Sequence, residues 1–340
     1  MKKVFIILLV TVIILMSVGS LISCGPGAPA KPVTLRLAGP WPPMDPVTEQ
    51  LQAFADGFNA RAPEGYKMEV HPGESLVKMM ESLDAVRTGA VEMAGMPIAP
   101  FSANDPRFAA AEVPFLVNNA EADAAIQERT LPMYSKVLEE KFNQKAISSF
   151  TVLALEPVST RPVKTSADWK GLLVHAISPI AASTIERLGG APVAMPFPEI
   201  YSGLDKGTVD ASMFATTGMI AFKIQEVASH VTLAYIIPAA VVIDINLDVW
   251  NKLPNNVQDL LVEEGLKAQR ETNARFVENG KKNPGILAGL GIDVYVLPQA
   301  EREKWREAVR PYSEKLIADM GDFGQELLKI AAEINAKYPY

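Results

Sequence analysis

The sequence predicts an α/β fold built as two domains. Short runs typical of strands are followed repeatedly by runs with helical spacing, and this alternation indicates sheets packed against helices. The chain from Val33 to Tyr340 is long enough for two domains of ordinary size. Only one cysteine occurs in 340 residues, so no intrachain disulfide is expected and the core must come from side-chain packing.

The beginning of the chain has the pattern of an export signal followed by a spacer. A positively charged Met1-Lys2-Lys3 precedes a long apolar stretch that ends in Leu21-Ile22-Ser23-Cys24. These last four residues resemble the lipobox of bacterial lipoproteins, which implies cleavage of residues 1–23 and a lipid on the Cys24 thiol. Residues 24–32 are rich in Pro, Gly and Ala and are expected to form an extended spacer. The alternative is a transmembrane anchor with an incidental cysteine, since about 19 apolar residues just span a bilayer.

The charge of the chain narrows the range of partners. The net charge of −7 becomes −9 once the two lysines of the signal are removed. Because phosphate binding needs clustered Lys and Arg, this acidic chain is not expected to bind nucleic acid.

No stretch after residue 32 is apolar enough to span a bilayer. We therefore expect an exported protein, lipid-anchored to the cell membrane and facing the periplasm or the cell exterior.

The first half of the body shows three strands that alternate with two helices. The expected strands are residues 34–38, 67–71 and 91–95. Apolar residues at helical spacing predict one helix over residues 47–58 and a second over 76–86, closed by Gly89. The methionines of the second helix, Met79 and Met80, are expected to fill the core.

The second half repeats this alternation and ends in helices. Residues 147–155 look β-like, and the strand 172–176 leads into Ser178-Pro179, a helix N-cap with proline at the first helical position. That helix is expected to end at Gly189-Gly190. The remaining expected elements are a short helix over 199–206, a strand over 209–213, a strand over 239–246 that crosses back to the first domain, and helices over 257–278, 299–318 and 324–336.

Familiar catalytic and cofactor motifs are missing from the sequence. No glycine-rich dinucleotide motif follows a strand, and neither a phosphate loop nor a Gly-x-Ser-x-Gly elbow occurs. The three histidines, His71, His175 and His230, are scattered and do not have the spacing of zinc ligands. We expect no metal, no cofactor and no enzymatic activity. A triad or an acid pair assembled only in three dimensions stays open as an alternative.

Three stretches of the body carry a recognisable pattern. The first is His71-Pro72-Gly73-Glu74-Ser75-Leu76, and the second is Val113-Pro114-Phe115-Leu116. The third and most specific begins Arg161-Pro162-Val163-Lys164 and continues through Trp169-Lys170-Gly171 as far as Asp210. Together they resemble the DctP-type solute-binding proteins of TRAP (tripartite ATP-independent periplasmic) transporters, and the resemblance spans nearly the whole body.

The resemblance implies a periplasmic-binding-protein-like clamshell of type II-like topology, with long C-terminal helices. A small organic solute would bind in the cleft between two domains, and cleft closure would let the receptor dock on TRAP membrane permease subunits. The expected domains are residues 33–153 plus about 243–283, and residues 154–242 plus about 284–340.

The chain departs from the family's pattern at three places. In relatives, the strand that matches residues 172–176 carries an arginine that grips a ligand carboxylate, whereas His175 stands here. A second arginine that often precedes the Arg161-Pro162 motif is missing from Leu153-Ala154-Leu155-Glu156. Phe214 takes the place of an asparagine that touches ligand. These changes predict an organic acid that is more apolar or aromatic than is usual for the family.

Five residues are our candidates for ligand contact. They are Trp41, Met96, His175, Phe214 and Thr216. Packing is the alternative role for Trp41 and Met96, and for His175 it is support of other ligand-binding residues. Three other functions stay open: a lipoprotein of the same fold that senses its ligand, an extracytoplasmic hydrolase or other enzyme, and a purely structural cell-envelope lipoprotein.

Overall fold

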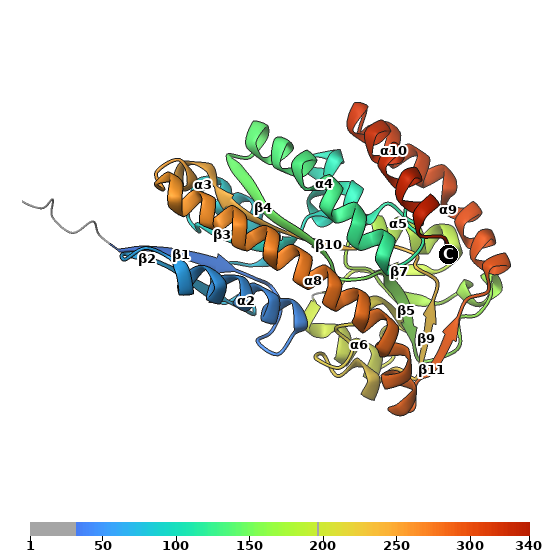
Figure 1. Ribbon diagram of the computed structural model, residues 1–340. Coiled ribbons are helices and arrows are strands. Elements are labelled where there is room, and N and C mark those ends of the chain that lie inside the picture. The colour runs from blue at the N-terminus through green and yellow to red at the C-terminus, as the bar shows by residue number, and fades with distance from the viewer. Residues whose placement is uncertain (1–31, 196) are drawn as a thin grey trace, which may run out of the picture.

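The computed structural model describes residues 32–195 and 197–340. Its chain forms two β-sheets flanked by helices, and the long C-terminal helices lie along one side (Figure 1). This confirms the expected two-part α/β architecture. The predicted signal, Cys24 and the spacer before Pro32 lie outside the described residues.

The first sheet, called sheet I below, has five strands in the order β2-β1-β3-β10-β4. Strands β1, β2 and β3 are parallel, whereas β10 runs antiparallel to both of its neighbours. The last strand before the C-terminal third therefore returns to the first sheet, as the sequence predicted. The strands are β1 (Val33–Ala38), β2 (Tyr66–His71), β3 (Met93–Pro97), β4 (Gln144–Thr151) and β10 (Ala240–Asn246).

The second sheet, sheet II, has six strands in the order β11-β9-β5-β8-β6-β7. Strand β5 is antiparallel to β8 and β9, and β6 is parallel to β7 and β8. The strands are β5 (Leu155–Ser159), β6 (Leu173–His175), β7 (Ala191–Val193), β8 (Ala211–Ala215), β9 (His230–Leu233) and β11 (Asp293–Val296).

Helices cover both faces of sheet I, and α8 connects sheet I to sheet II. One apolar core lies between sheet I and helices α2 and α8, and another lies on the side of α4 and α10. Figure 1 shows α8 as a long helix that runs from beside sheet I to the neighbourhood of β11. The helices are α2 (Pro46–Arg61), α3 (Ser82–Thr88), α4 (Ala120–Lys141), α5 (Pro179–Leu188), α6 (Ile200–Asp205), α7 (Leu247–Trp250), α8 (Asn255–Gly289), α9 (Gln299–Asp319) and α10 (Asp322–Lys337).

Helix α5 begins and ends where its local sequence predicts. The Ser178 hydroxyl accepts a hydrogen bond from the backbone N–H of Ala181 at 3.0 Å, and Pro179 occupies the first helical position. Gly189 ends the helix with φ of 103°, a left-handed conformation that suits glycine. The Ser-Pro and Gly-Gly signals are therefore confirmed as the two ends of this helix.

The helix expected over residues 76–86 is wrong in its first half. A single 3₁₀ turn covers Met79–Glu81, and α3 begins only at Ser82. The carboxylate of Glu74 accepts the backbone N–H of Met79 at 2.9 Å, so a local turn competes with helix formation. Met80 is 59% exposed, which corrects the expectation that it fills the core.

The single β-run expected over residues 147–155 is two strands in different sheets. Strand β4 ends at Thr151 and β5 begins at Leu155. Leu153 lies between them with φ of 70°, which an extended strand does not allow. The chain thus crosses from sheet I to sheet II at this residue.

Helix α8 is longer than its apolar pattern indicated. It runs to Gly289 and includes Pro284, whereas the expected helix ended at residue 278. Strands β7, β9 and β11 and helix α4 were not among the expected elements. Within residues 32–195 and 197–340, no helix combines the length and the apolar character that a membrane span requires.

Candidate ligand site

The five candidate residues lie in or after strands of the two sheets. Met96 belongs to β3 of sheet I, and Trp41 lies in the loop that follows β1 of the same sheet. His175 ends β6, Phe214 lies in β8, and Thr216 directly follows β8. In open α/β sheets, ligands bind beyond the carboxyl ends of parallel strands. His175 and Thr216 lie at such ends, whereas Met96 and Phe214 each lie one residue before the end of their strand.

His175 is a buried and fully bonded imidazole. The residue is 1% exposed, with its ring Nδ1 2.9 Å from the Ser212 hydroxyl oxygen and its Nε2 3.3 Å from the carbonyl oxygen of Met195. Because a carbonyl only accepts, Nε2 carries the proton and Nδ1 accepts from Ser212. Burial lowers the pKa of His175 to about 4, although the bond to the Met195 carbonyl opposes this shift. The residue is therefore neutral and does not replace the charge of an arginine.

Phe214 is a buried apolar residue of β8, the strand that pairs with β6. It is 4% exposed and meets Phe222 edge to face, with ring centroids 5.6 Å apart. Gly218 lies so close to the Phe214 ring that a Cβ there would be 3.1 Å from it. Thr216 is also buried, and its carbonyl accepts the Met219 N–H at 3.4 Å. The turn after β8 is thus compact and largely apolar.

On sheet I, Trp41 is partly buried and Met96 is fully buried. The Trp41 carbonyl accepts the Gly73 N–H at 2.7 Å and the Thr48 hydroxyl at 3.1 Å, which joins the loops after β1 and β2. The Met96 sulfur accepts a hydrogen bond from the Ser82 hydroxyl at 2.9 Å within the core. Met96 therefore packs in this core in the described arrangement.

The region that lacks the second arginine holds a buried acid instead. Glu156 is 3% exposed and accepts the backbone N–H of Tyr235 at 2.7 Å and that of Ala234 at 3.1 Å. Burial raises the pKa of Glu156 to about 8, against the effects of these two donors and of the nearby Arg302 guanidinium. This carboxyl is protonated at neutral pH and adds no charge to the site.

Sequence reasoning missed the partners of these candidates. Ser212 lies opposite His175 in the register of β6 and β8, so a correct strand pairing would have found it. Met195 follows β7, a strand of three residues with no clear signal in the sequence.

A further buried acid lies at the start of α5, outside the set of candidates. Glu112 accepts a hydrogen bond from the hydroxyl of Ser178, and burial raises the pKa of Glu112 to about 7.

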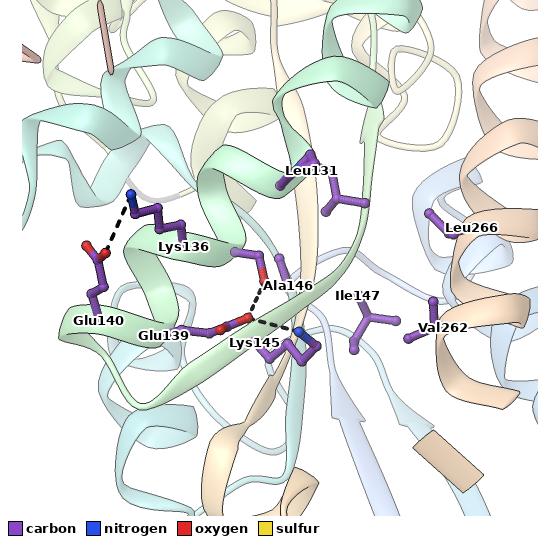
Figure 2. A pocket seen from close by; sticks show the side chains of 11 residues that line it. Leu131, Lys136, Glu139, Glu140, Lys145, Ala146, Ile147, Val262 and Leu266 are labelled. Carbon is purple, nitrogen blue, oxygen red and sulfur yellow. Dashed lines mark hydrogen bonds and ion pairs between the residues drawn. The ribbon is translucent and has the colours of Figure 1, made fainter. Parts of the chain in front are cut away.

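Two cavities lined by the described residues lie away from the five candidate residues. The larger, of about 470 Å³, lies between α4, β4 and α8, and Figure 2 shows its apolar floor and charged rim. Lys145 pairs with Glu139 at 2.9 Å and Lys136 with Glu140 at 3.9 Å, so the charges of this rim are compensated. The smaller, of about 220 Å³, lies between α5, α9 and residues 102–109. Neither is lined by any of the five candidates.

No metal site is evident at the strand ends. Among the described residues, no group of three or more His, Cys, Asp or Glu side chains is arranged to hold a metal ion.

Most of the chain is similar in sequence to known proteins. Residues 37–319 match the family described as bacterial extracellular solute-binding protein, family 7, also called DctP. A solute-binding protein of Albidiferax ferrireducens is 26% identical over 294 residues, covering 83% of this chain and 85% of that protein. The C4-dicarboxylate-binding periplasmic protein DctP of Rhodobacter capsulatus is 23% identical over 304 residues, covering 86% of this chain and 89% of that protein.

Solved structures share the fold at lower identity. A Bordetella pertussis extracytoplasmic solute receptor that binds pyroglutamic acid superposes with a TM-score of 0.83 at 19% identity, covering 88% of this chain and 99% of that one. A TRAP periplasmic solute-binding protein of Desulfovibrio salexigens with bound orotic acid gives a TM-score of 0.79 at 22% identity, covering 89% and 99%.

Proposed function

Because the chain belongs to the DctP family of bacterial extracellular solute-binding proteins, we propose that it captures a small organic acid for a TRAP transporter. The names of its relatives support this ligand class. They include proteins that bind C4-dicarboxylates and 2,3-diketo-L-gulonate, and receptors with pyroglutamic acid and orotic acid. Cleft closure around the ligand would give the form that docks on the membrane permease subunits.

We further infer that the ligand is a monoacid with an apolar or aromatic body. The observation that carries this inference is the neutral His175, whose two ring nitrogens are already bonded to Ser212 and Met195. A carboxylate buried beside Phe214 without a cation would lose several kcal/mol of hydration. One acid group can be held by backbone N–H groups and hydroxyls, but a second would lack a partner. Two structural neighbours bind cyclic acids with a single carboxyl group, pyroglutamic acid and orotic acid.

The proposed domains follow the strands of the two sheets, although α10, which is assigned to the second domain, packs on α4 beside sheet I. One comprises residues 33–153 plus about 243–283, and the other residues 154–242 plus about 284–340. The membership of β10 in sheet I, beginning at Ala240, supports a second boundary a few residues before 243. A ligand that contacts both domains only in the closed form shifts the population toward that form.

The lipid anchor on Cys24 stays a proposal, as does localisation at the membrane surface. It is supported by the lipobox-like residues and by the export expected of an extracellular family. A spacer of residues 24–32 would keep the receptor within a short reach of its permease and raise the effective concentration of each for the other. Mass spectrometry of protein from the native host tests this, since an unmodified or absent Cys24 would contradict it.

Thermal-shift screening of the mature protein tests the ligand class. A ligand that binds only the folded state raises the melting temperature by an amount set by its affinity and concentration. We expect stabilisation by apolar or aromatic monoacids, and less by succinate and sialic acid. Strong stabilisation by dicarboxylates alone would refute the inference. We also propose that the protein is not an enzyme, so bound ligand should be recovered unchanged after prolonged incubation.

A further inference from the structure

The chain crosses between the two sheets through two short segments that lie side by side. The first covers residues 152–154, between β4 and β5, and the second covers residues 234–239, between β9 and β10. The Val152 N–H donates to the Ala239 carbonyl at 3.0 Å, and the Leu155 N–H donates to the Ile237 carbonyl at 2.8 Å. Together with α8, the backbone torsions of these two segments therefore set how the sheets are oriented relative to each other.

Both crossings contain a residue in the left-handed region. Leu153 has φ of 70° and Tyr235 has φ of 51°, a conformation that non-glycine residues rarely adopt. Such residues persist only where their surroundings hold them. Leu153 is held by its N–H bond to the Thr151 hydroxyl at 2.8 Å and by α8, whose Gly280 lies against its side chain.

Tyr235 is held from three sides. Its N–H donates to Glu156 at 2.7 Å and its carbonyl accepts from Arg302 at 3.4 Å. Its phenol hydroxyl donates to the carboxylate of Asp123 at 3.2 Å, and that same oxygen accepts the Thr151 hydroxyl at 2.7 Å. Glu156 belongs to sheet II, whereas Asp123 lies on α4, which packs on β4 of sheet I.

Tyr235 thus links the two sides of the crossing. Its backbone N–H is bonded to Glu156 of sheet II, and its phenol hydroxyl is bonded to Asp123 beside Thr151, the last residue of β4. Asp123 is fully buried, so water does not readily replace the phenol as its donor. A hydrogen bond weakens steeply with distance and angle, so this bond forms over only a narrow range of sheet orientations.

We propose that Tyr235 is a positioning residue of the hinge, and that its bond to Asp123 holds the two sheets in the described orientation. The relevance of this orientation to ligand capture rests on the proposed function. The hinge itself is testable without any ligand.

The experiment measures the distance between two spin labels, one on each domain, by double electron–electron resonance. The mature chain carries Cys24→Ser together with Glu64→Cys and Lys206→Cys, two exposed positions. The matched variants are Tyr235→Phe and Tyr134→Phe. Tyr134 is also buried, but it packs in the core beside sheet I, against Phe323. Each variant removes one phenol oxygen from the interior.

We expect the Tyr235→Phe distance distribution to shift or broaden, and the Tyr134→Phe distribution to match that of the parent. A Tyr235→Phe distribution that superimposes on the parent would overturn the proposal, as would an equal change in Tyr134→Phe. Melting temperatures of all variants separate loss of stability from loss of orientation. Because no ligand is added, a failed ligand screen would count against the proposed function and leave this result standing.

Discussion

Replacing the buried carboxyl of Glu156 by an amide is expected to remove part of the pH dependence of stability. Burial raises the pKa of Glu156 from 4.5 to about 8. Between these two values the folded state retains a proton that the unfolded state has lost. Stability therefore decreases as the pH rises through this window, and it is fully present only below about pH 4.5.

The size of the effect follows from the width of the window. The free energy of unfolding should fall by about 1.4 kcal/mol per pH unit from this group, or on the order of 4 kcal/mol between pH 5 and pH 8. In Glu156→Gln the amide resembles the protonated acid and keeps an oxygen for the N–H groups of Ala234 and Tyr235. The variant should lose this contribution. The raised pKa values of Glu112 and Asp123 leave some pH dependence in both proteins.

Urea unfolding of the parent and of Glu156→Gln at several pH values between 5 and 8 measures the difference. The control is Glu128→Gln, at an exposed position of α4, which should follow the parent. If the free energies of unfolding of Glu156→Gln and the parent run parallel across this range, the buried carboxyl is not protonated as argued.

Four further substitutions test the site and the packing around it. His175→Arg should move ligand preference toward dicarboxylates in a thermal-shift screen, and unchanged preference would place residue 175 outside the pocket. Gly265→Ala should destabilise the protein by about 1–3 kcal/mol, because its Cβ would lie 2.5 Å from a methyl group and 3.0 Å from the carbonyl oxygen of Ile147. Gly285→Ala, in the same helix with nothing near its Cβ, should instead stabilise by about 0.5–1 kcal/mol; equal effects in urea titrations would contradict the argument. Ser178→Ala should cost about 2–4 kcal/mol, since it removes the N-cap of α5 and a donor to a buried carboxyl, and a loss under 1 kcal/mol would show that neither bond matters.

Local signals predicted the elements that depend on short-range interactions. The Ser178-Pro179 and Gly189 signals marked the two ends of α5 because capping involves only neighbouring residues. Strand β1 and helix α2 followed from the period of their apolar residues. The family followed from motifs around Arg161 and Trp169, and the match over residues 37–319 confirmed it.

Elements that depend on distant partners were not predictable in this way. The break at Leu153 interrupts an apolar run, and only the pairing of β4 and β5 in different sheets shows it. Strand β7 has three residues and exists because β6 offers it an edge. Helix α8 continues through Pro284 to Gly289, where it packs near β11, although its apolar stripe indicated an earlier end.

The sequence by itself determined the α/β class, the family and the absence of an arginine at position 175, since these depend on which residues are present and in what order. Only the tertiary structure decided that His175 is neutral and already bonded, because Ser212 and Met195 approach it from other strands and loops. It also decided that Tyr235 lies between two buried carboxyls. The protonation and bonding of a buried group depend on which chain segments surround it, and only folding brings those segments together.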